Sequence, residues 1–259
     1  MKSETLQRET TNGLTSHQIA EKYNISVKTV HTLGKEFNIE LNIDYTDRLS
    51  PTEEEFLFGK ILGDGYLTKI VGNANSHLQI GHGRKQKDYV WDNYIYIKNW
   101  CNTEPKDREQ KRDPKIYKTD TLEKTVLATK CHTEFTRLRR YFYEFDRKVI
   151  NNDILSNITP LALAIWYQDD GSIETDSRSK KTTGLKLHTL QFCLEDNQKI
   201  CKWFLDTYNI HVNVNKTQKG KNGQQQYNLR ISKRCFQTFK DLIEPYVHES
   251  MKYKIELKG

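Results

Sequence analysis

Two apolar segments of this chain share one plan, and this duplication restricts the possible folds more than any other feature. Residues 50–67 read SPTEEEFLFGKILGDGYL and residues 159–171 read TPLALAIWYQDDG. Each segment begins with Ser or Thr followed by Pro, which suit the N-cap and the first helical position. Each apolar run then ends in Asp-Gly. The repeat predicts two similar halves, each opened by an apolar helix that ends in an acid.

A lysine near the end of each half strengthens the duplication. Lys148 follows Asp64 by 84 residues (148 − 64), and Lys254 follows Asp170 by the same 84 residues (254 − 170). Arg147 is the alternative to Lys148, because the alignment of the first half could shift by one residue there. The sequence therefore predicts halves at residues 50–155 and 156–259, after a small domain and linker in residues 1–45.

Between these markers, each half mixes extended and helical patterns. Strands are expected at 76–83, 121–129, 185–194, 211–218 and 224–232, and helices at 88–101, 197–208 and 233–246. The segment KGKNG at 219–223 predicts a basic hairpin turn, because Asn-Gly favours tight β-turns. One face of this hairpin is apolar, and the other is the usual polar face of an antiparallel sheet or a surface for base edges. The candidate DNA contacts here are Asn213, Asn215, Lys219, Lys221, Gln226, Asn228 and Arg230.

Residues 14–39 have the pattern of two capped helices joined by a short turn. Thr15 with Gln18 forms a predicted capping box, and Ser26 is the expected N-cap of the second helix. The pattern resembles a DNA-binding helix-turn-helix, with an ordinary helical hairpin as the alternative and Gly34 as a feature that counts against it. A third helix is expected within residues 3–12. The side chains expected to face DNA are Lys28, Thr29, His31, Thr32 and Lys35.

Charge and composition narrow the class of protein. The net charge is +7 with a pI near 9.0, which favours a polyanionic partner without proving one. The five cysteines show neither CxxC pairs nor zinc-binding spacing, so free thiols are expected. We found neither an apolar run long enough to span a bilayer nor a signal-peptide pattern. We therefore expect a soluble intracellular protein, in the cytoplasm or an organelle matrix, without a membrane partner.

The segments FLFGKILGDGYL and LALAIWYQDDGSI resemble the two copies of the motif that names the LAGLIDADG homing endonucleases of the monomeric, double-motif branch. The resemblance covers residues 50–259. It implies an α+β fold of two pseudo-symmetric αββαββα halves whose strands form a saddle over double-stranded DNA, beside the all-α N-terminal domain. It implies a single chain that cuts both strands of a long asymmetric site and leaves short 3′ overhangs. Asp64 and Asp170 would be metal ligands, the carbonyls of Gly63 and Asp169 additional ligands, and Lys148 and Lys254 catalytic partners.

The chemistry of these residues supports the same hypothesis. Gly59 and Gly63 lie four residues apart, so they place small residues on one helix face and allow close helix packing. Close packing would bring Asp64 and Asp170 together, and two adjacent carboxylates repel unless a cation neutralises them. Hard oxygen ligands suit Mg²⁺, with Mn²⁺ as a substitute. A divalent ion between such acids can activate water and stabilise a leaving oxygen.

Two residues depart from the family pattern. Lys60 stands where the motif has an apolar residue, so we expect it to extend its amine to solvent or the first helix to pack differently. Asp169 stands where a small residue is usual, and its side chain is expected to be an auxiliary ligand or solvated. Two other functions remain open on the same scaffold. One is a maturase that binds intron RNA, and the other is a DNA-binding regulator that does not cut.

Overall fold

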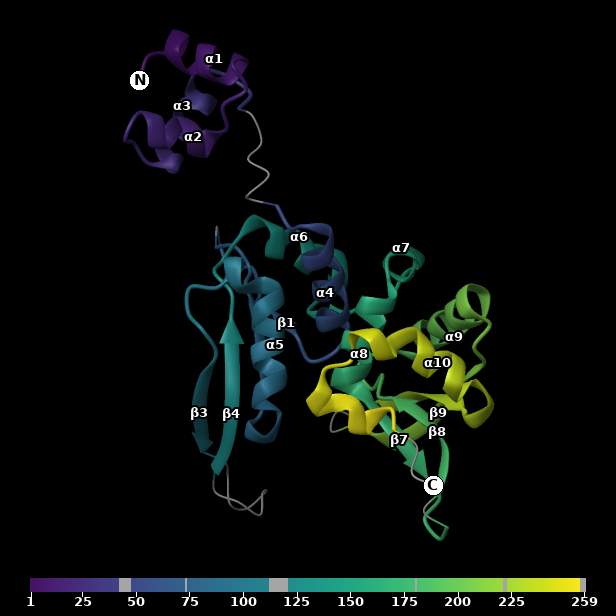
Figure 1. Cartoon of the computed structure of the whole chain (residues 1–259). Coiled ribbons are helices and arrows are strands. Elements are labelled where there is room, and N and C mark those ends of the chain that lie inside the picture. The colour runs from purple at the N-terminus through teal and green to yellow at the C-terminus, as the bar shows by residue number, and fades with distance from the viewer. Residues whose placement is uncertain (42–47, 73, 112–120, 180, 221–222, 257–259) are drawn as a thin grey trace. The chain divides into compact units, whose positions relative to one another are not determined.

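The chain forms two compact units in the computed structural model, and each is described separately (Figure 1). The first unit is Met1–Ser50 and the second is Pro51–Gly259. The structure describes residues 1–41, 48–72, 74–111, 121–179, 181–220 and 223–256. In these ranges we found no helix with the length and apolar character needed to cross a membrane.

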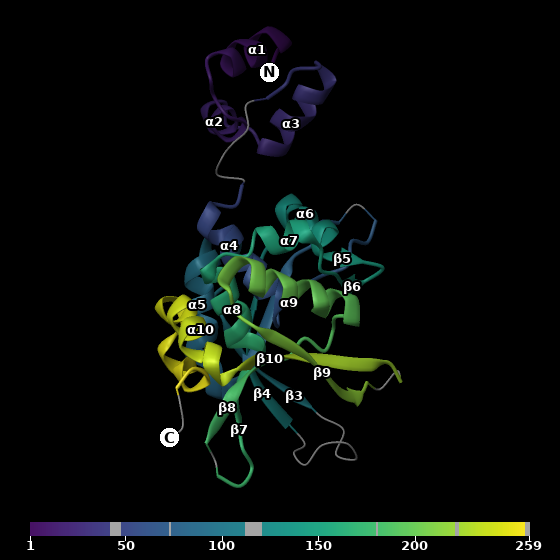
Figure 2. The same cartoon turned by 90° about the vertical axis from the view of Figure 1, so that its right-hand side faces the viewer.

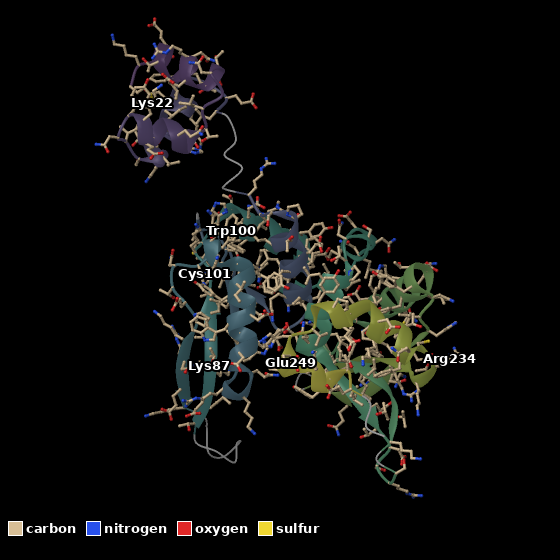
Figure 3. All side chains as sticks on the ribbon, in the orientation of Figure 1. Lys22, Lys87, Trp100, Cys101, Arg234 and Glu249 are labelled. Atoms are coloured by element: carbon tan, nitrogen blue, oxygen red, sulfur yellow. The ribbon has the colours of Figure 1, made fainter. Side chains whose placement is uncertain are left out.

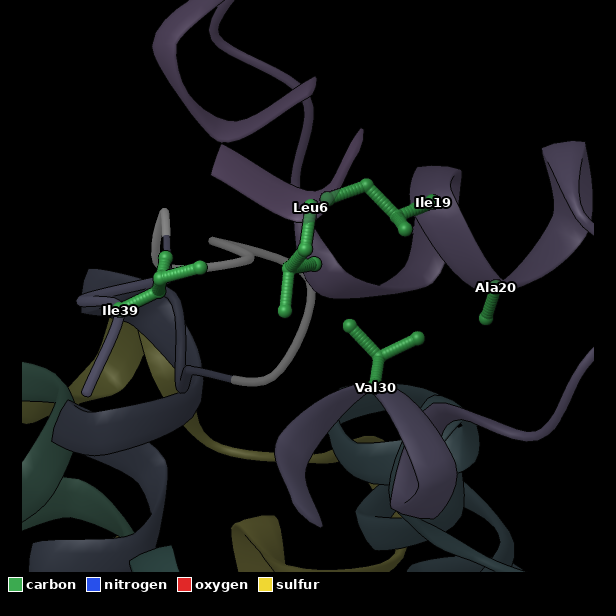
Figure 4. Close-up of a cluster of buried hydrophobic side chains, with 5 residues drawn as sticks. All are labelled: Leu6, Ile19, Ala20, Val30 and Ile39. Carbon is green, nitrogen blue, oxygen red and sulfur yellow. The ribbon is translucent and has the colours of Figure 1, made fainter. Parts of the chain in front are cut away.

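The N-terminal unit is a three-helix bundle. Its helices are α1 (Ser3–Thr11), α2 (Ser16–Lys22) and α3 (Val27–Glu36). Thr15 and Gln18 form the predicted capping box, and the side chain of Ser26 caps α3. Gly34 fits inside α3 because an added Cβ would lie 2.9 Å from the side chain of Leu41. The centre of the bundle, shown in Figure 4, consists of Leu6, Ile19, Ala20, Val30 and Ile39.

Two apolar helices form the centre of the larger unit. Helix α4 (Pro51–Leu62) and helix α8 (Pro160–Asp170) lie side by side between the two sheets (Figure 1). Their backbones touch at Gly59, where an added Cβ would lie 2.2 Å from the carbonyl oxygen of Ala162. The small residue therefore permits the close helix contact that the motif predicts.

Each half then contributes a four-stranded antiparallel sheet. The first contains β1 (Tyr66–Leu67), β2 (Leu78–Gly83), β3 (Lys106–Lys111) and β4 (Thr121–Ala128), in the order β1-β2-β4-β3. The second contains β7 (Gly171–Thr175), β8 (Thr182–Leu187), β9 (Val212–Lys219) and β10 (Gln225–Ser232), in the equivalent order β7-β8-β10-β9. Figure 2 shows α4 and α8 on one side of these strands.

Further helices complete each half. The first half adds α5 (Lys87–Ile97) and α6 (Thr133–Phe142), and the second adds α9 (Leu194–Tyr208) and α10 (Phe236–Ile243). The element order of each half is αββαββα, as the family resemblance predicts. A short hairpin of β5 (Tyr143–Glu144) and β6 (Arg147–Lys148) and helix α7 (Asn152–Ser156) connect the halves. The short 3-10 helices are η2 (Arg84–Gln86), η3 (Lys98–Trp100), η4 (Lys233–Cys235), η5 (Glu244–Tyr246) and η6 (Glu249–Lys254).

Several of the expected elements differ in their bounds from the prediction; the helix expected at 233–246, for example, is α-helical only over Phe236–Ile243. The strand expected at 185–194 ends at Leu187, because the chain turns there and enters α9 at Leu194. In this turn Gln191 donates a hydrogen bond to the carbonyl of Leu62, at a distance of 2.7 Å. The helix expected at 88–101 ends at Ile97 and continues as a 3-10 turn to Trp100.

Candidate active site

The two motif acids lie at equivalent ends of the paired helices. Asp64 follows the last turn of α4, and Asp170 is the last residue of α8. The side chain of Asp64 is 47% exposed, and Asp170 is partly buried. The amide of His188 donates to the carbonyl of Asp170 at 2.9 Å, which joins the end of α8 to the second sheet. Both carboxylates are therefore held at the junction between a central helix and a sheet, with part of their surface open.

Burial and repulsion by neighbouring carboxylates make both acids harder to ionise than an ordinary carboxyl. Partial burial, together with the charges of Asp64 and Asp169, raises the pKa of Asp170 to about 7. The pKa of Asp64 is also raised, first by burial and then by Asp169. Carboxylates in such an arrangement gain from a bound cation, because the cation offsets the repulsion that disfavours their charged form. The donor set thus suits a divalent ion.

Each motif end also contacts one of the predicted lysines. The Nζ of Lys148 donates to the carbonyl of Gly63 at 2.7 Å. The Nζ of Lys254 donates to the carbonyls of Gln168 at 2.6 Å and Asp169 at 3.1 Å. The resemblance implies the carbonyls of Gly63 and Asp169 as metal ligands, and each of them already accepts a hydrogen bond from a lysine. One lone pair therefore remains on each carbonyl oxygen. Burial lowers the pKa of Lys148 to about 8.

Arg147, the alternative to Lys148, lies elsewhere. Its side chain is exposed and lines a separate cavity with residues of the second half, including Gln191 and Tyr227. On strand β6, neighbouring residues point to opposite faces, so only one of the pair can reach the motif end. The contact to Gly63 identifies Lys148 as that residue.

The structure contradicts the solvent-exposed alternatives for Lys60 and for the side chain of Asp169, whereas the auxiliary-ligand alternative for Asp169 stays a prediction. Lys60 does not extend to solvent, and Asp169 is not solvated, because both side chains are 0% exposed and form an ion pair of 2.7 Å. Burial alone would raise the pKa of Asp169, but the charge of Lys60, together with His82 and the hydrogen bonds from Lys60 and the Asp64 amide, holds this pKa below its ordinary value. The two departures from the motif therefore compensate each other across the helix interface.

Sequence reasoning missed several polar residues around this pair. Tyr89 on α5 donates to Asp169 at 2.9 Å, and His82 on β2 lies 3.6 Å from Asp64 and from Asp169. A usable signal existed for His82, since His188 follows it at the offset that relates Asp64 to Asp170 (188 − 82 = 106 and 170 − 64 = 106). Burial lowers the pKa of His82 to about 4, so this imidazole is neutral near pH 7.

Asp64, His82 and Asp169 could together hold a metal ion, because one ligand atom of each lies within 4.8 Å of the others. Of the three, Asp169 is the least available. Its Oδ1 accepts from Lys60 and Tyr89, and its Oδ2 accepts from the amide of Asp64 at 2.9 Å. Among these three residues, Asp64 therefore has the carboxylate that is most accessible to a metal ion.

Four of the hairpin candidates share one face of the second sheet as the alternation predicts, and one of these, Asn228, is buried. Asn213 pairs with Arg230, and Asn215 pairs with Asn228, while Leu229 and Ile231 between them are fully buried. A β-bulge interrupts the register between Gln225 and Tyr227, where Gln226 lies. Lys219 ends β9 and is exposed. Lys221 lies outside the described residues.

The first sheet carries a comparable polar face that sequence reasoning did not identify. A cavity of about 540 Å³ opens over it and reaches Asp64. Its basic and amide side chains come from all three long strands: Gln79 on β2, Lys106 and Arg108 on β3, and Lys124 on β4. Strand β3 was missed because its sequence, KDREQK, contains no apolar residue to reveal a strand period.

In the N-terminal unit, the five candidates on α3 are all exposed. Three of them also form local hydrogen bonds: Thr29 with Ser26, Thr32 with the carbonyl of Lys28, and His31 with Ser16. The ammonium groups of Lys28 and Lys35 are therefore positive charges that this helix presents to solvent.

Comparisons with known proteins agree with this geometry. A model of the LAGLIDADG DNA endonuclease family matches residues 54–239. The chain is 31% identical over 233 residues to the probable intron-encoded endonuclease 1 of Wickerhamomyces canadensis, covering 86% of this chain and 93% of that one. It is 28% identical over 216 residues to the cytochrome b mRNA maturase bI2 of Debaryomyces hansenii, covering 82% and 77%.

A solved structure shows the same fold. The homing endonuclease I-WcaI, bound to its DNA recognition sequence, superposes with a TM-score of 0.71 and 27% identity, covering 82% of this chain and 88% of that one. Residues 54–239, the part that the family model matches, contain most of α4, all of α8, both acids and the described strands of both sheets. This chain belongs to the LAGLIDADG DNA endonuclease family.

Proposed function

We propose that this chain is a site-specific homing endonuclease that hydrolyses one phosphodiester on each strand of a long asymmetric DNA duplex. The observation that carries this proposal is the paired site itself. Two acids end two packed helices, and each helix end accepts a hydrogen bond from its own lysine. One chain supplies both halves, so a monomer suffices for two cuts.

In this proposal Asp64 and Asp170 hold divalent metal, with Mg²⁺ as the natural ion and Mn²⁺ as a substitute. The carbonyls of Gly63 and Asp169 serve as additional ligands through their remaining lone pairs. A bound ion would supply positive charge to the phosphate and lower the pKa of a nearby water. The raised pKa values of both acids support the assignment, because such carboxylates gain from a cation.

The two lysines act beside the acids. Each Nζ is fixed by a backbone carbonyl at the motif end, so its position is set before DNA binds. An ammonium group held there can stabilise the negative charge that develops on the phosphate, and it can hold a water molecule by hydrogen bonding. The depressed pKa of Lys148, about 8, keeps this amine close to the range where it can exchange a proton.

The polar faces of the two sheets would contact the duplex. Each face combines amide side chains with basic ones, which suits base edges and phosphates respectively. On the second sheet, Glu174 holds Lys186 at 2.9 Å and also pairs with Arg230, so two basic side chains are held in place on this surface. The N-terminal unit would lengthen the footprint by placing α3 in a major groove.

A maturase that binds intron RNA is the second candidate function. The likeness to the maturase of Debaryomyces hansenii, over 82% of this chain, favours keeping it. The two functions need different ligands, so binding to duplex DNA and binding to intron RNA can be measured separately on one preparation. The retained acids and lysines favour cutting over a regulator that only binds DNA.

Cleavage assays on acid variants test the main proposal. A target duplex is first selected from a randomised library by binding without Mg²⁺, and is then placed in a plasmid. The wild-type chain should linearise this plasmid with Mg²⁺, whereas Asp64→Asn and Asp170→Asn should bind it with unchanged affinity and not cut. Asp206→Asn, on an exposed side chain, is the control. Cleavage by either motif variant at the wild-type rate would falsify the assignment.

A further inference from the structure

The buried Lys60–Asp169 pair serves only one of the two halves. The offset of 106 residues that relates Asp64 to Asp170 also relates Lys60 to Trp166 and Gly63 to Asp169 (166 − 60 = 106 and 169 − 63 = 106). The second half therefore has a fully buried tryptophan where the first has the lysine. The repeat that makes the two acids equivalent does not extend to the residues behind them.

The pair lies directly behind Asp64. The carboxylate of Asp169 accepts the backbone N–H of Asp64 at 2.9 Å through Oδ2. It also covers Gly63 so closely that a Cβ at this position would lie 2.5 Å from Oδ2. The conformation of the chain at residues 63 and 64 is therefore set by a side chain from the other half.

Asp169 is in turn fixed from several sides. Its Oδ1 receives hydrogen bonds from Lys60 at 2.7 Å and from Tyr89 at 2.9 Å. Lys60 is held by Tyr89 as well, with 3.3 Å between Nζ and the hydroxyl, and its ammonium lies 4.6 Å from the centre of that ring. His82 lies 3.5 Å from the same ammonium. All four side chains are almost fully buried, so solvent cannot replace these contacts.

From these contacts we propose that Lys60 and Asp169 form a positioning pair for Asp64 alone, and that the two strand cuts of this enzyme therefore depend on different supports. The inference rests on the proposed function, in which each half serves one strand. Asp169 acts through the amide of Asp64, and Lys60 acts by neutralising and orienting Asp169. A misplacement of about 1 Å can slow a reaction about 100-fold, so losing this support should show in one strand.

The test uses variants that remove both charges together, because one partner left alone would be a buried unpaired charge. Lys60→Met with Asp169→Asn keeps an oxygen that can accept from the amide of Asp64. Lys60→Met with Asp169→Ala removes that acceptor. Both double variants lose the ion pair, so a difference between them reports the hydrogen bond to the amide of Asp64. Thermal unfolding of each protein measures any general destabilisation.

The measurement is the cutting rate of each strand on a duplex labelled at both 5′ ends. Lys148→Met and Lys254→Met first assign each strand to a half. The alanine double variant should cut the strand assigned to Lys148 about 100-fold more slowly relative to the other strand, and should accumulate nicked DNA. The asparagine double variant should keep a strand ratio within a few-fold of wild type.

A second readout does not depend on cutting. The amide proton of Asp64 should lose its hydrogen-bonded chemical shift and its protection from exchange in the alanine double variant, and keep both in the asparagine one. Equal slowing of both strands, or an unchanged strand ratio in the alanine variant, would overturn the inference. If the two lysine variants slow the same strand, the division of strands between halves fails instead, and the amide readout still tests the positioning role.

Discussion

Gly59 of the first motif helix lies against the backbone carbonyl of Ala162 in the second. A Cβ built at Gly59 would lie 2.2 Å from that oxygen and 2.8 Å from the Cβ of Ile165. The two helices meet at this point through backbone atoms, which cannot move aside as a flexible side chain could. The separation of the two halves, and with it the spacing of Asp64 and Asp170, therefore depends on a residue without a side chain.

We expect Gly59→Ala to destabilise the larger unit by about 2 kcal/mol, because overpacking at a rigid contact costs about 3 kcal/mol and the gain in helix propensity is only about 1 kcal/mol. Urea unfolding followed by tryptophan fluorescence measures the change. Gly83→Ala is the matched control, since a Cβ there meets nothing within 4 Å. If the Gly59 variant were as stable as wild type, the close helix contact would not exist in solution.

Gln168 connects the second motif helix to the segment that carries Lys254. Its Oε1 accepts from the amide of His248 at 2.7 Å, and its Nε2 donates to the carbonyl of Tyr246 at 3.2 Å. Gln168→Leu removes the partner of these partly buried backbone groups, so we expect a loss of about 2 kcal/mol in unfolding free energy. The His248 amide should also exchange faster with solvent. Gln237→Leu, at an exposed glutamine, should change neither measurement.

The motif repeat carries most of what the sequence reveals about this fold. Each apolar run begins with Ser or Thr before Pro and ends in Asp-Gly, and each half has a matching lysine, all of which are local patterns or simple spacings. The Lys60–Asp169 pair is different, because its partners are 109 residues apart and meet only when the two helices dock. Each looked like an isolated departure from the motif, and the sequence contains no signal that links them.

Strand β3 shows a second limit. Sequence reasoning detects strands through apolar residues that repeat every second position, and β3 has none. It lies at the edge of its sheet and, among the described strands, pairs with β4 alone, so it needs fewer apolar side chains than a central strand. Polar strands on a binding surface are thus the elements that apolar periodicity is least able to predict.

The charged residues of α3 give a third prediction. Lys28→Ala and Lys35→Ala should each weaken DNA binding at every sequence and reduce the slope of log affinity against log salt by about 0.9, if each lysine contacts a phosphate. Fluorescence anisotropy between low and moderate salt measures the slope. Lys2→Ala removes an exposed charge outside α3 and should leave it unchanged. Equal slopes in all four proteins would remove α3 from the DNA interface.

Glu9 makes the N-terminal unit sensitive to acid. Its side chain is only 2% exposed. Its carboxylate accepts hydrogen bonds from the ammonium of Lys22 and from the hydroxyl of Tyr23, each at 2.7 Å. Lys22 is labelled in Figure 3. The bonds to Lys22 and Tyr23 lower the pKa of Glu9 to about 2. Because the folded-state pKa is depressed, its stabilising contribution is complete above the ordinary glutamate value. It is lost as the pH falls from about 4.5 towards 2.

Hydrogen exchange at the amides of α1, α2 and α3 measures this loss. In the wild-type chain, protection of these helices should fall steeply below about pH 4.5. Glu9→Gln should start with weaker protection at pH 7, because a neutral amide replaces the ion pair, and should then lose less on acidification. Glu4→Gln, at an exposed position of the same helix, should follow the wild-type curve. An acid response in Glu9→Gln as steep as that of wild type would show that other carboxyl groups cause it.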